Sequence, residues 1–130
     1  MNATPSRRIT VKNTAIAAAA ALVTDLVVYA IAKGVGVTME VNTPYPITAV
    51  TVGLLTALPL LLAALVVALI AAKKPRFQTF AAWIGLVVAL LSVANPFISA
   101  TQISTAFSLA PMHIVVGAAW FLLARPTPTS

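Results

Sequence analysis

The feature that most constrains this chain is a set of four long apolar stretches separated by short polar segments. The stretches cover residues 14–35, 47–72, 77–95 and 104–124. About 20 apolar residues in an α-helix rise ~30 Å, which is the thickness of the hydrocarbon core of a bilayer. The pattern therefore predicts an all-α, polytopic membrane four-helix bundle over residues 14–125, with one domain.

Composition supports this class of protein. Hydrophobic residues make up 61% of the 130 positions and charged residues only 8%, whereas a soluble domain carries roughly 25% charged residues. The net charge of +6 would indicate nucleic acid as the partner of a soluble protein, but here the basic residues flank the apolar stretches. We therefore expect the lipid bilayer as the partner, and no nucleic acid.

The distribution of basic residues predicts the orientation of the spans. Seven of them fall on one side of the bilayer and only Lys33 on the other; the seven are Arg7, Arg8, Lys12, Lys73, Lys74, Arg76 and Arg125. Cytoplasmic loops carry an excess of Lys and Arg. The bias predicts a multi-pass protein of the cell (plasma or cytoplasmic) membrane, with a cytoplasmic arm at residues 1–13 and a cytoplasmic tail at residues 126–130.

An export signal is the alternative interpretation of the N-terminus. Ser6-Arg7-Arg8 before an apolar stretch is typical of a twin-arginine signal, and Ala30-Ile31-Ala32 is typical of a cleavage site. However, the stretch is longer than the ~7–15 residues of a signal core, and Asp25 interrupts it. A retained first span is the better interpretation.

Two proline-containing segments raise questions of function. The link Val37–Pro46 contains two prolines, and it is either a plain connector or a small cap over the outer mouth of the bundle. Pro59 lies in the middle of the second span and leaves the Leu55 carbonyl without its usual donor. It is either a structural bend or a functional hinge. Asn95-Pro96 is expected to end the third span, followed by an outer turn over residues 97–103.

Small residues at helical spacing predict the faces on which helices pack. Small side chains let helix backbones approach closely within a bilayer. The candidates are Gly53 and Ala57 in the second span, Gly85 and Ala89 in the third, and Gly117 in the fourth.

Two ionisable residues lie within the spans, Asp25 in the first and His113, the single histidine, in the last. Counted from Lys12 and Arg125, both lie ~18–20 Å deep, and each lies on the small-residue face of its helix. An unpaired carboxylate at this depth costs about 2.5–3.5 kcal/mol. We therefore predict a buried polar pair between Asp25 and His113, either ionic or neutral.

The last span carries a resemblance to a known family. The segment Leu109-Ala110-Pro111-Met112-His113 and the aliphatic residues after it resemble the final helix of an uncharacterised family of small four-span actinobacterial membrane proteins. The resemblance implies a four-span layout and no activity. In that family an amide often occupies the position of Asp25, so the resemblance implies no mechanism that depends on a carboxylate there.

No catalytic pattern is visible in the sequence. There is no phosphate-binding loop, no Ser/His/Asp set and no cysteine, and a metal site would need more ligands than Asp25, His113 and Met112 supply. We expect neither an enzyme nor a bound cofactor or metal. A structural or accessory subunit, in a homo-oligomer or a larger membrane complex, is the favoured hypothesis. A minimal proton-linked transporter or sensor using Asp25 and His113 is the alternative, and binding of lipid or a small apolar ligand is the third.

Overall fold

The computed structural model describes residues 8–126, and these form five α-helices. Their bounds are α1 (Val11–Gly34), α2 (Ala49–Lys73), α3 (Arg76–Ser92), α4 (Ala94–Ser99) and α5 (Ile103–Ala124). Within the described residues, α1, α2, α5 and the combined segment Arg76–Ser99 are long and apolar enough to cross a membrane. The predicted all-α, four-span fold is confirmed. Arg7 and most of the predicted arm and tail lie outside the described residues.

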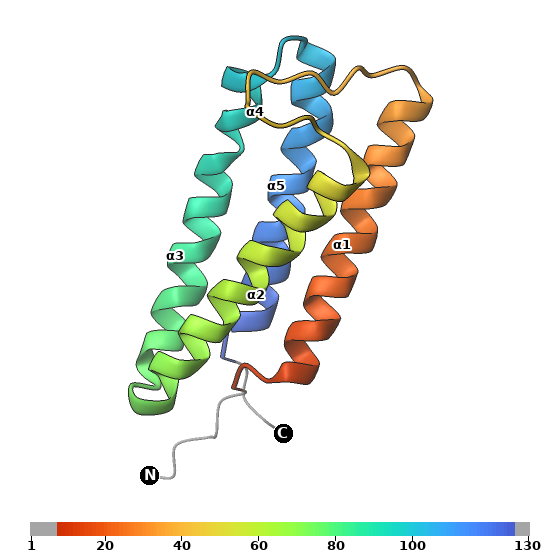
Figure 1. Ribbon diagram of the computed structural model, residues 1–130. Helices are drawn as coiled ribbons and strands as arrows, with labels where there is room; N and C mark the ends of the chain where they lie inside the picture. Colours follow the sequence, from red (N-terminus) through yellow and green to blue (C-terminus); the bar gives the residue numbers. More distant parts are fainter. Residues whose placement is uncertain (1–7, 127–130) are drawn as a thin grey trace.

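The helices form an elongated bundle in which α1 packs against both α2 and α5, and α5 also packs against α3 (Figure 1). By contrast, α2 has a less extensive contact with α3 and with α5. The short helix α4 continues the direction of α3 and packs against the start of α5, where Phe97 and Phe107 meet edge to face with centroids 5.2 Å apart. The bundle is therefore closed on the α1 and α5 side and looser around α2.

The third span extends farther than the sequence predicts. Asn95-Pro96 does not end the helical segment, because α4 includes both residues and runs on to Ser99. Proline is tolerated in the first turn of a helix, where its missing N–H has no partner to lose. The helix is interrupted only at Val93, and α4 begins at Ala94. The turn before α5 therefore covers residues 100–102 instead of the predicted 97–103.

The ends of α1 and α2 are set by local polar residues. The Thr10 side chain caps α1 by accepting a hydrogen bond from the backbone of Asn13, and Thr48 and Thr51 form a reciprocal capping box at the start of α2. At the other end of α1, Gly36 adopts a positive φ of 91°. The backbone N–H of Val37 bonds to the Ala32 carbonyl at 2.9 Å, and that of Gly36 to the Lys33 carbonyl at 3.1 Å. This is the arrangement that terminates many helices at a glycine.

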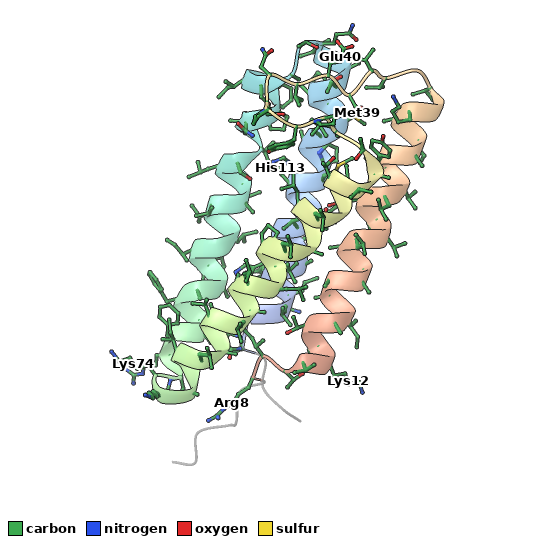
Figure 2. The ribbon with its side chains drawn as sticks, viewed as in Figure 1. Arg8, Lys12, Met39, Glu40, Lys74 and His113 are labelled. Carbon is green, nitrogen blue, oxygen red and sulfur yellow. The ribbon has the colours of Figure 1, made fainter. Side chains whose placement is uncertain are left out.

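The charged residues separate along the bundle axis. Arg8, Lys12 and Lys74 lie at one end, and Glu40 lies at the other (Figure 2). The C-terminus of α5 is at the basic end, because the Gln78 side chain of α3 donates a 2.9 Å hydrogen bond to the carbonyl of Ala124. One end of the bundle is thus strongly basic, as the loop charges predict.

The interface of α3 with α5 is closely packed. A Cβ added to Gly85 would lie only 3.0 Å from Cε2 of Trp120 and closer still to other atoms of the indole, and one added to Gly117 would lie 2.7 Å from Cβ of Ala89. The indole of Trp120 also donates a 2.9 Å hydrogen bond to the carbonyl of Ala81. Glycine is required at both positions because the facing helix fills the space that a side chain would take.

The link Val37–Pro46, here called the outer link, crosses the end of the bundle that lies opposite the basic one (Figure 1). Val41 forms an isolated antiparallel bridge with Ala100, and the backbone of Asn42 donates to the Ser99 carbonyl at 2.8 Å. Met39, with a positive φ of 59°, buries its side chain against the outer ends of the helices and is 3% exposed. The position of the link favours the second interpretation, a small cap over the mouth of the bundle, over a plain connector.

Candidate functional site

A cavity of about 780 Å³ lies between α2, α3 and α5, below the outer link. Its walls are mainly aliphatic, and its polar lining residues include Asp25, Thr56, Ser92 and His113. This volume is within the ~300–1,000 Å³ range of small-molecule sites.

The cavity opens sideways between α2 and α3. The lining residues Leu62 of α2 and Val88 of α3 are 60% and 59% exposed. Val66 and Ile84 lie nearby on the same two helices and are also exposed. These exposed apolar side chains flank the opening of the cavity on both helices.

Asp25 is the most deeply buried polar residue of the site, with 0% of its side chain exposed. Alanines at Ala18, Ala21 and Ala32 place it on the packed face of α1, as the sequence predicts. Its Oδ2 accepts a 2.7 Å hydrogen bond from the hydroxyl of Thr56 on α2, whereas its Oδ1 is buried without a hydrogen-bond partner among the described residues. A buried polar atom without a partner is rare and costly.

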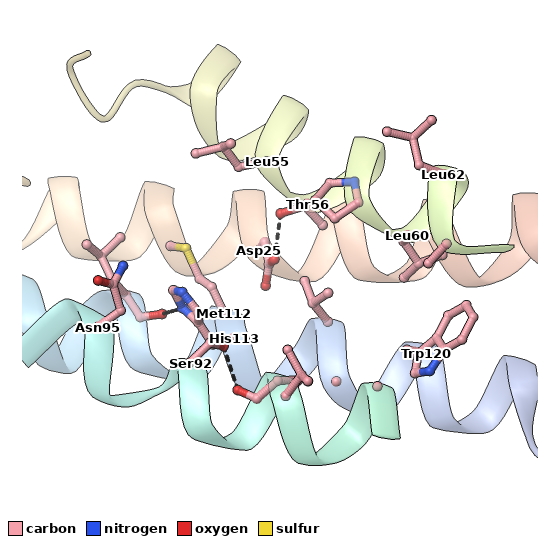
Figure 3. Close-up of a pocket in the computed structure, with 18 of the residues that line it drawn as sticks. Asp25, Leu55, Thr56, Leu60, Leu62, Ser92, Asn95, Met112, His113 and Trp120 are labelled. Carbon is pink, nitrogen blue, oxygen red and sulfur yellow. Dashed lines mark hydrogen bonds between the residues drawn. The ribbon is translucent and has the colours of Figure 1, made fainter. Parts of the chain in front are cut away.

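His113 lines the same cavity from α5 and is partly buried (Figure 3). Its Nδ1 lies 3.1 Å from the carbonyl oxygen of Leu109, one turn back along α5. A carbonyl oxygen only accepts, so Nδ1 carries the hydrogen of this bond and Nε2 is an acceptor whenever the ring is neutral.

Asp25 and His113, the two members of the predicted buried polar pair, line the same cavity but are not joined by a direct hydrogen bond among the described residues. Asp25 bonds to Thr56 and His113 to its own helix, and within residues 8–126 no hydrogen bond or ion pair joins the two. The physical reason is that α2 lies against α1 and offers a hydroxyl to the carboxylate. The hydrogen bond of the buried carboxylate therefore joins α1 to α2 instead of α1 to α5.

The polar site separates two apolar clusters along the bundle. The inner cluster contains Leu60, Ala64 and Trp120, and the outer one contains Met39, Val52 and Met112. Asp25 and Thr56 lie between these clusters along α1 and α2. The site is therefore a polar layer between two apolar ones.

The other candidate positions have different environments. Pro59 lies within a continuous α2, and it lines the cavity together with Leu55, whose carbonyl it deprives of a donor. A Cβ at Gly53 would meet only the end of the Leu22 side chain, at 3.3 Å. Ala57 is partly buried. These α2 positions are thus less tightly packed than Gly85, Ala89 and Gly117.

Sequence reasoning missed the importance of Thr56 and Trp120. Thr56 is one of several threonines near midplane, and its 4% exposure distinguishes it only in the structure. The spacing of Trp120 from Gly117 could have indicated a ring packed beside a small-residue stripe. Among the described residues, no group of three or more His, Asp or Glu side chains is arranged to hold a metal ion.

Together, the four candidate spans and the cavity between the helices are those of a small polytopic membrane protein. The chain belongs to a family of unknown function, DUF6069, whose sequence model matches residues 5–130. The resemblance of the last helix to a family of unknown function is confirmed on this point. No curated protein and no solved structure matches the chain.

Proposed function

We propose that this protein binds a small, membrane-soluble amphipathic molecule in the cavity between α2, α3 and α5. The observation that carries the proposal is the combination of a cavity of about 780 Å³ with a buried carboxylate that has one unpaired oxygen. Ligand sites are typically apolar pockets with a few convergent polar groups. The ligand enters from the bilayer, through the opening between α2 and α3.

This function accounts for more of the molecule than the other hypotheses do. A purely structural subunit needs packed faces but has no use for a cavity of this size. A proton-linked transporter needs a polar path across the membrane, whereas the segments on either side of Asp25 pack in apolar clusters. Binding without catalysis fits a site whose ionisable side chains are Asp25, His113 and, at its outer end, Tyr45.

For orientation, we propose that the basic end of the bundle faces the cytoplasm and that the protein lies in the plasma membrane. Lys12 and Lys74 at one end and Glu40 at the other support this orientation. Reporter fusions after Lys74 and at Ser130 are expected to score as cytoplasmic and a fusion at Asn42 as external. The reverse pattern would contradict the proposed orientation without affecting the cavity.

The binding proposal is tested by filling the cavity. Val116→Phe adds bulk to a partly buried lining position on α5. After mild extraction from membranes, native mass spectrometry is expected to detect a small molecule retained by the parent protein and lost from this variant. The matched control is Ile114→Phe on the same helix, because Ile114 is 49% exposed and lies outside the cavity lining.

The outcome is decided by comparing the three proteins. Retention by the parent and by Ile114→Phe, with loss from Val116→Phe, supports the proposal. Equal retention by all three proteins, or no retained molecule in any of them, would overturn it. Thermal melting of each protein establishes that a loss of ligand does not result from unfolding.

A further inference from the structure

We infer that the ligand is a lipophilic amine, an apolar molecule whose protonated amino group binds between Asp25 and His113. The inference rests on the proposed binding function and names its ligand class. It follows from the hydrogen-bonding character of the cavity wall, where two acceptors are free for a ligand and most donors are already bonded.

Four of the five hydroxyl groups that line the cavity already use their hydrogens, and the fifth is that of Tyr45. Thr56 donates to Asp25 at 2.7 Å, and Ser92 donates to the carbonyl of Ala89 at 2.6 Å. Nearer the outer end, Thr43 and Ser99 donate to backbone carbonyls in the same way. The indole of Trp120 is likewise committed to a carbonyl. The remaining polar lining residues, Tyr45 and Asn95, are exposed at the outer end.

The acceptors are the groups left for a ligand. Oδ1 of Asp25 is buried without a partner among the described residues. Nε2 of His113 is an acceptor when Nδ1 alone carries the ring hydrogen, which it donates to Leu109. Figure 3 shows both side chains reaching the cavity from different helices. A head group that satisfies two acceptors must bring at least two hydrogens, and an ammonium group brings three.

Charge favours the ammonium over a neutral donor such as a hydroxyl. Among the described residues neither lysine nor arginine lines the cavity, so an ionised Asp25 has no permanently charged partner there, and His113 bonds to Leu109 instead of to Asp25. A charge within the bilayer is costly, and a bound cation lowers the cost by forming a charge-assisted hydrogen bond. A fatty acid would instead bring a second carboxylate next to Asp25, and the two like charges would repel each other.

The net charge of the protein makes the test more stringent. The whole chain carries a formal charge of +6, which repels amines and attracts carboxylates at long range. A preference for an amine therefore has to come from the cavity and cannot come from non-specific attraction to the protein.

The experiment uses the fluorescence of Trp120, which lines the cavity. Trp83→Phe removes the only other tryptophan, an exposed residue, and leaves Trp120 as the single reporter. The protein in zwitterionic nanodiscs is titrated with three brominated quenchers of equal chain length: an alkylamine, an alcohol and a carboxylate. We expect the amine to quench at concentrations roughly ten-fold lower than the alcohol. A charge-assisted hydrogen bond is roughly twice as strong as a neutral one, and a difference of this size changes affinity by about one order of magnitude. The carboxylate should be the weakest.

Variants of the two carboxylates identify the group responsible. Asp25→Asn is expected to abolish the preference for the amine over the alcohol. Glu40→Gln removes the other carboxylate of the chain, which lies outside the cavity lining, and should leave the preference intact.

The outcomes separate this inference from the binding function on which it rests. Equal quenching by amine and alcohol, or a preference for the amine that survives Asp25→Asn, would overturn the inference while leaving the binding function in place. If Val116→Phe weakens quenching by none of the three compounds, no compound occupies the cavity and both proposals fail.

Discussion

The two sides of the bundle differ in how completely they are packed. Between α3 and α5, the indole of Trp120 covers Gly85, and Gly117 lies against Ala89. The polar groups of Trp120 and Gln78 both donate to carbonyls across this interface. Around α2, a cavity of about 780 Å³ separates the helices and Oδ1 of Asp25 is unpaired.

This difference indicates that the α3–α5 interface contributes most to stability, whereas the region around α2 provides the binding site. In a bilayer, helix association depends on van der Waals contact and interhelical hydrogen bonds, since lipid is as apolar as leucine. The α3–α5 interface maximises both contributions. On the α2 side the helices are in less extensive contact, and Oδ1 of Asp25 is buried without a hydrogen-bond partner among the described residues. Both features are expected of a binding site without its ligand.

The largest effect is expected at the packed interface. Gly85→Leu would drive a side chain into the Trp120 indole, and we expect it to lower the free energy of unfolding by about 3 kcal/mol, the upper end of overpacking costs. Thermal melting in detergent measures the change. Leu62→Ile, an exposed position of α2, serves as the control and should leave the melting temperature unchanged. A Gly85→Leu protein that melts like the parent would show that the α3–α5 interface is not the stable half.

The next effect concerns the hydrogen bond between Thr56 of α2 and Asp25 of α1. Thr56→Val removes the hydroxyl that donates to Asp25, and an unsatisfied buried acceptor costs about 1–3 kcal/mol. We expect a loss of about 2 kcal/mol in a melting or denaturant experiment, and almost none for Thr56→Ser, which keeps the hydroxyl.

A pair of double-mutant cycles tests which partner Asp25 has. Asp25→Leu combined with Thr56→Val should show a coupling energy of about 1 kcal/mol. Asp25→Leu combined with His113→Gln should be additive within about 0.5 kcal/mol. A larger coupling to His113 than to Thr56 would restore the pairing of α1 with α5 that the sequence predicts.

The sequence predicts those features that depend on local pattern. The number and approximate length of the spans follow from apolar runs, and the buried face of α1 follows from alanines spaced around Asp25. Gly85 and Gly117 are also recognisable as contact positions, because a small residue at helical spacing indicates close approach whichever helix it meets.

The sequence fails where the answer depends on which helices are neighbours. Counting residues places Asp25 and His113 at one depth, but depth does not determine which helix supplies the hydrogen bond, and α2 supplies it through Thr56. The cavity has no local signature either, since it arises from the looser contact of α2 with α3 and α5. Asn95-Pro96 misleads because a proline that ends one helix also fits the first turn of the next.

A smaller effect is expected at the basic end of the packed interface. Gln78 is 5% exposed, and its side chain donates to the carbonyl of Ala124 in the last turn of α5, where carbonyls lack helical partners. Gln78→Leu should lower the free energy of unfolding by about 1 kcal/mol. Gln102→Leu is the control, because its 3.5 Å contact with Thr38 is exposed. Equal losses from the two variants would contradict a specific role for Gln78 in joining α3 to α5.

The smallest effect is expected at Gly53, the glycine of the loosely packed helix. A Cβ there would meet only Cδ1 of Leu22 at 3.3 Å, and the end of a flexible side chain moves aside easily. Alanine is favoured over glycine within a helix by roughly 0.5–1 kcal/mol, so Gly53→Ala should leave stability unchanged or raise it by about 0.5 kcal/mol. Gly85→Ala, the same substitution in α3, should be destabilising because the new Cβ meets a fixed indole instead of a mobile methyl group. Melting temperatures that change in opposite directions support the contrast between the two sides of the bundle. If both variants lose stability equally, α2 is packed as tightly as α3 at these positions. That result would contradict the looser packing around α2.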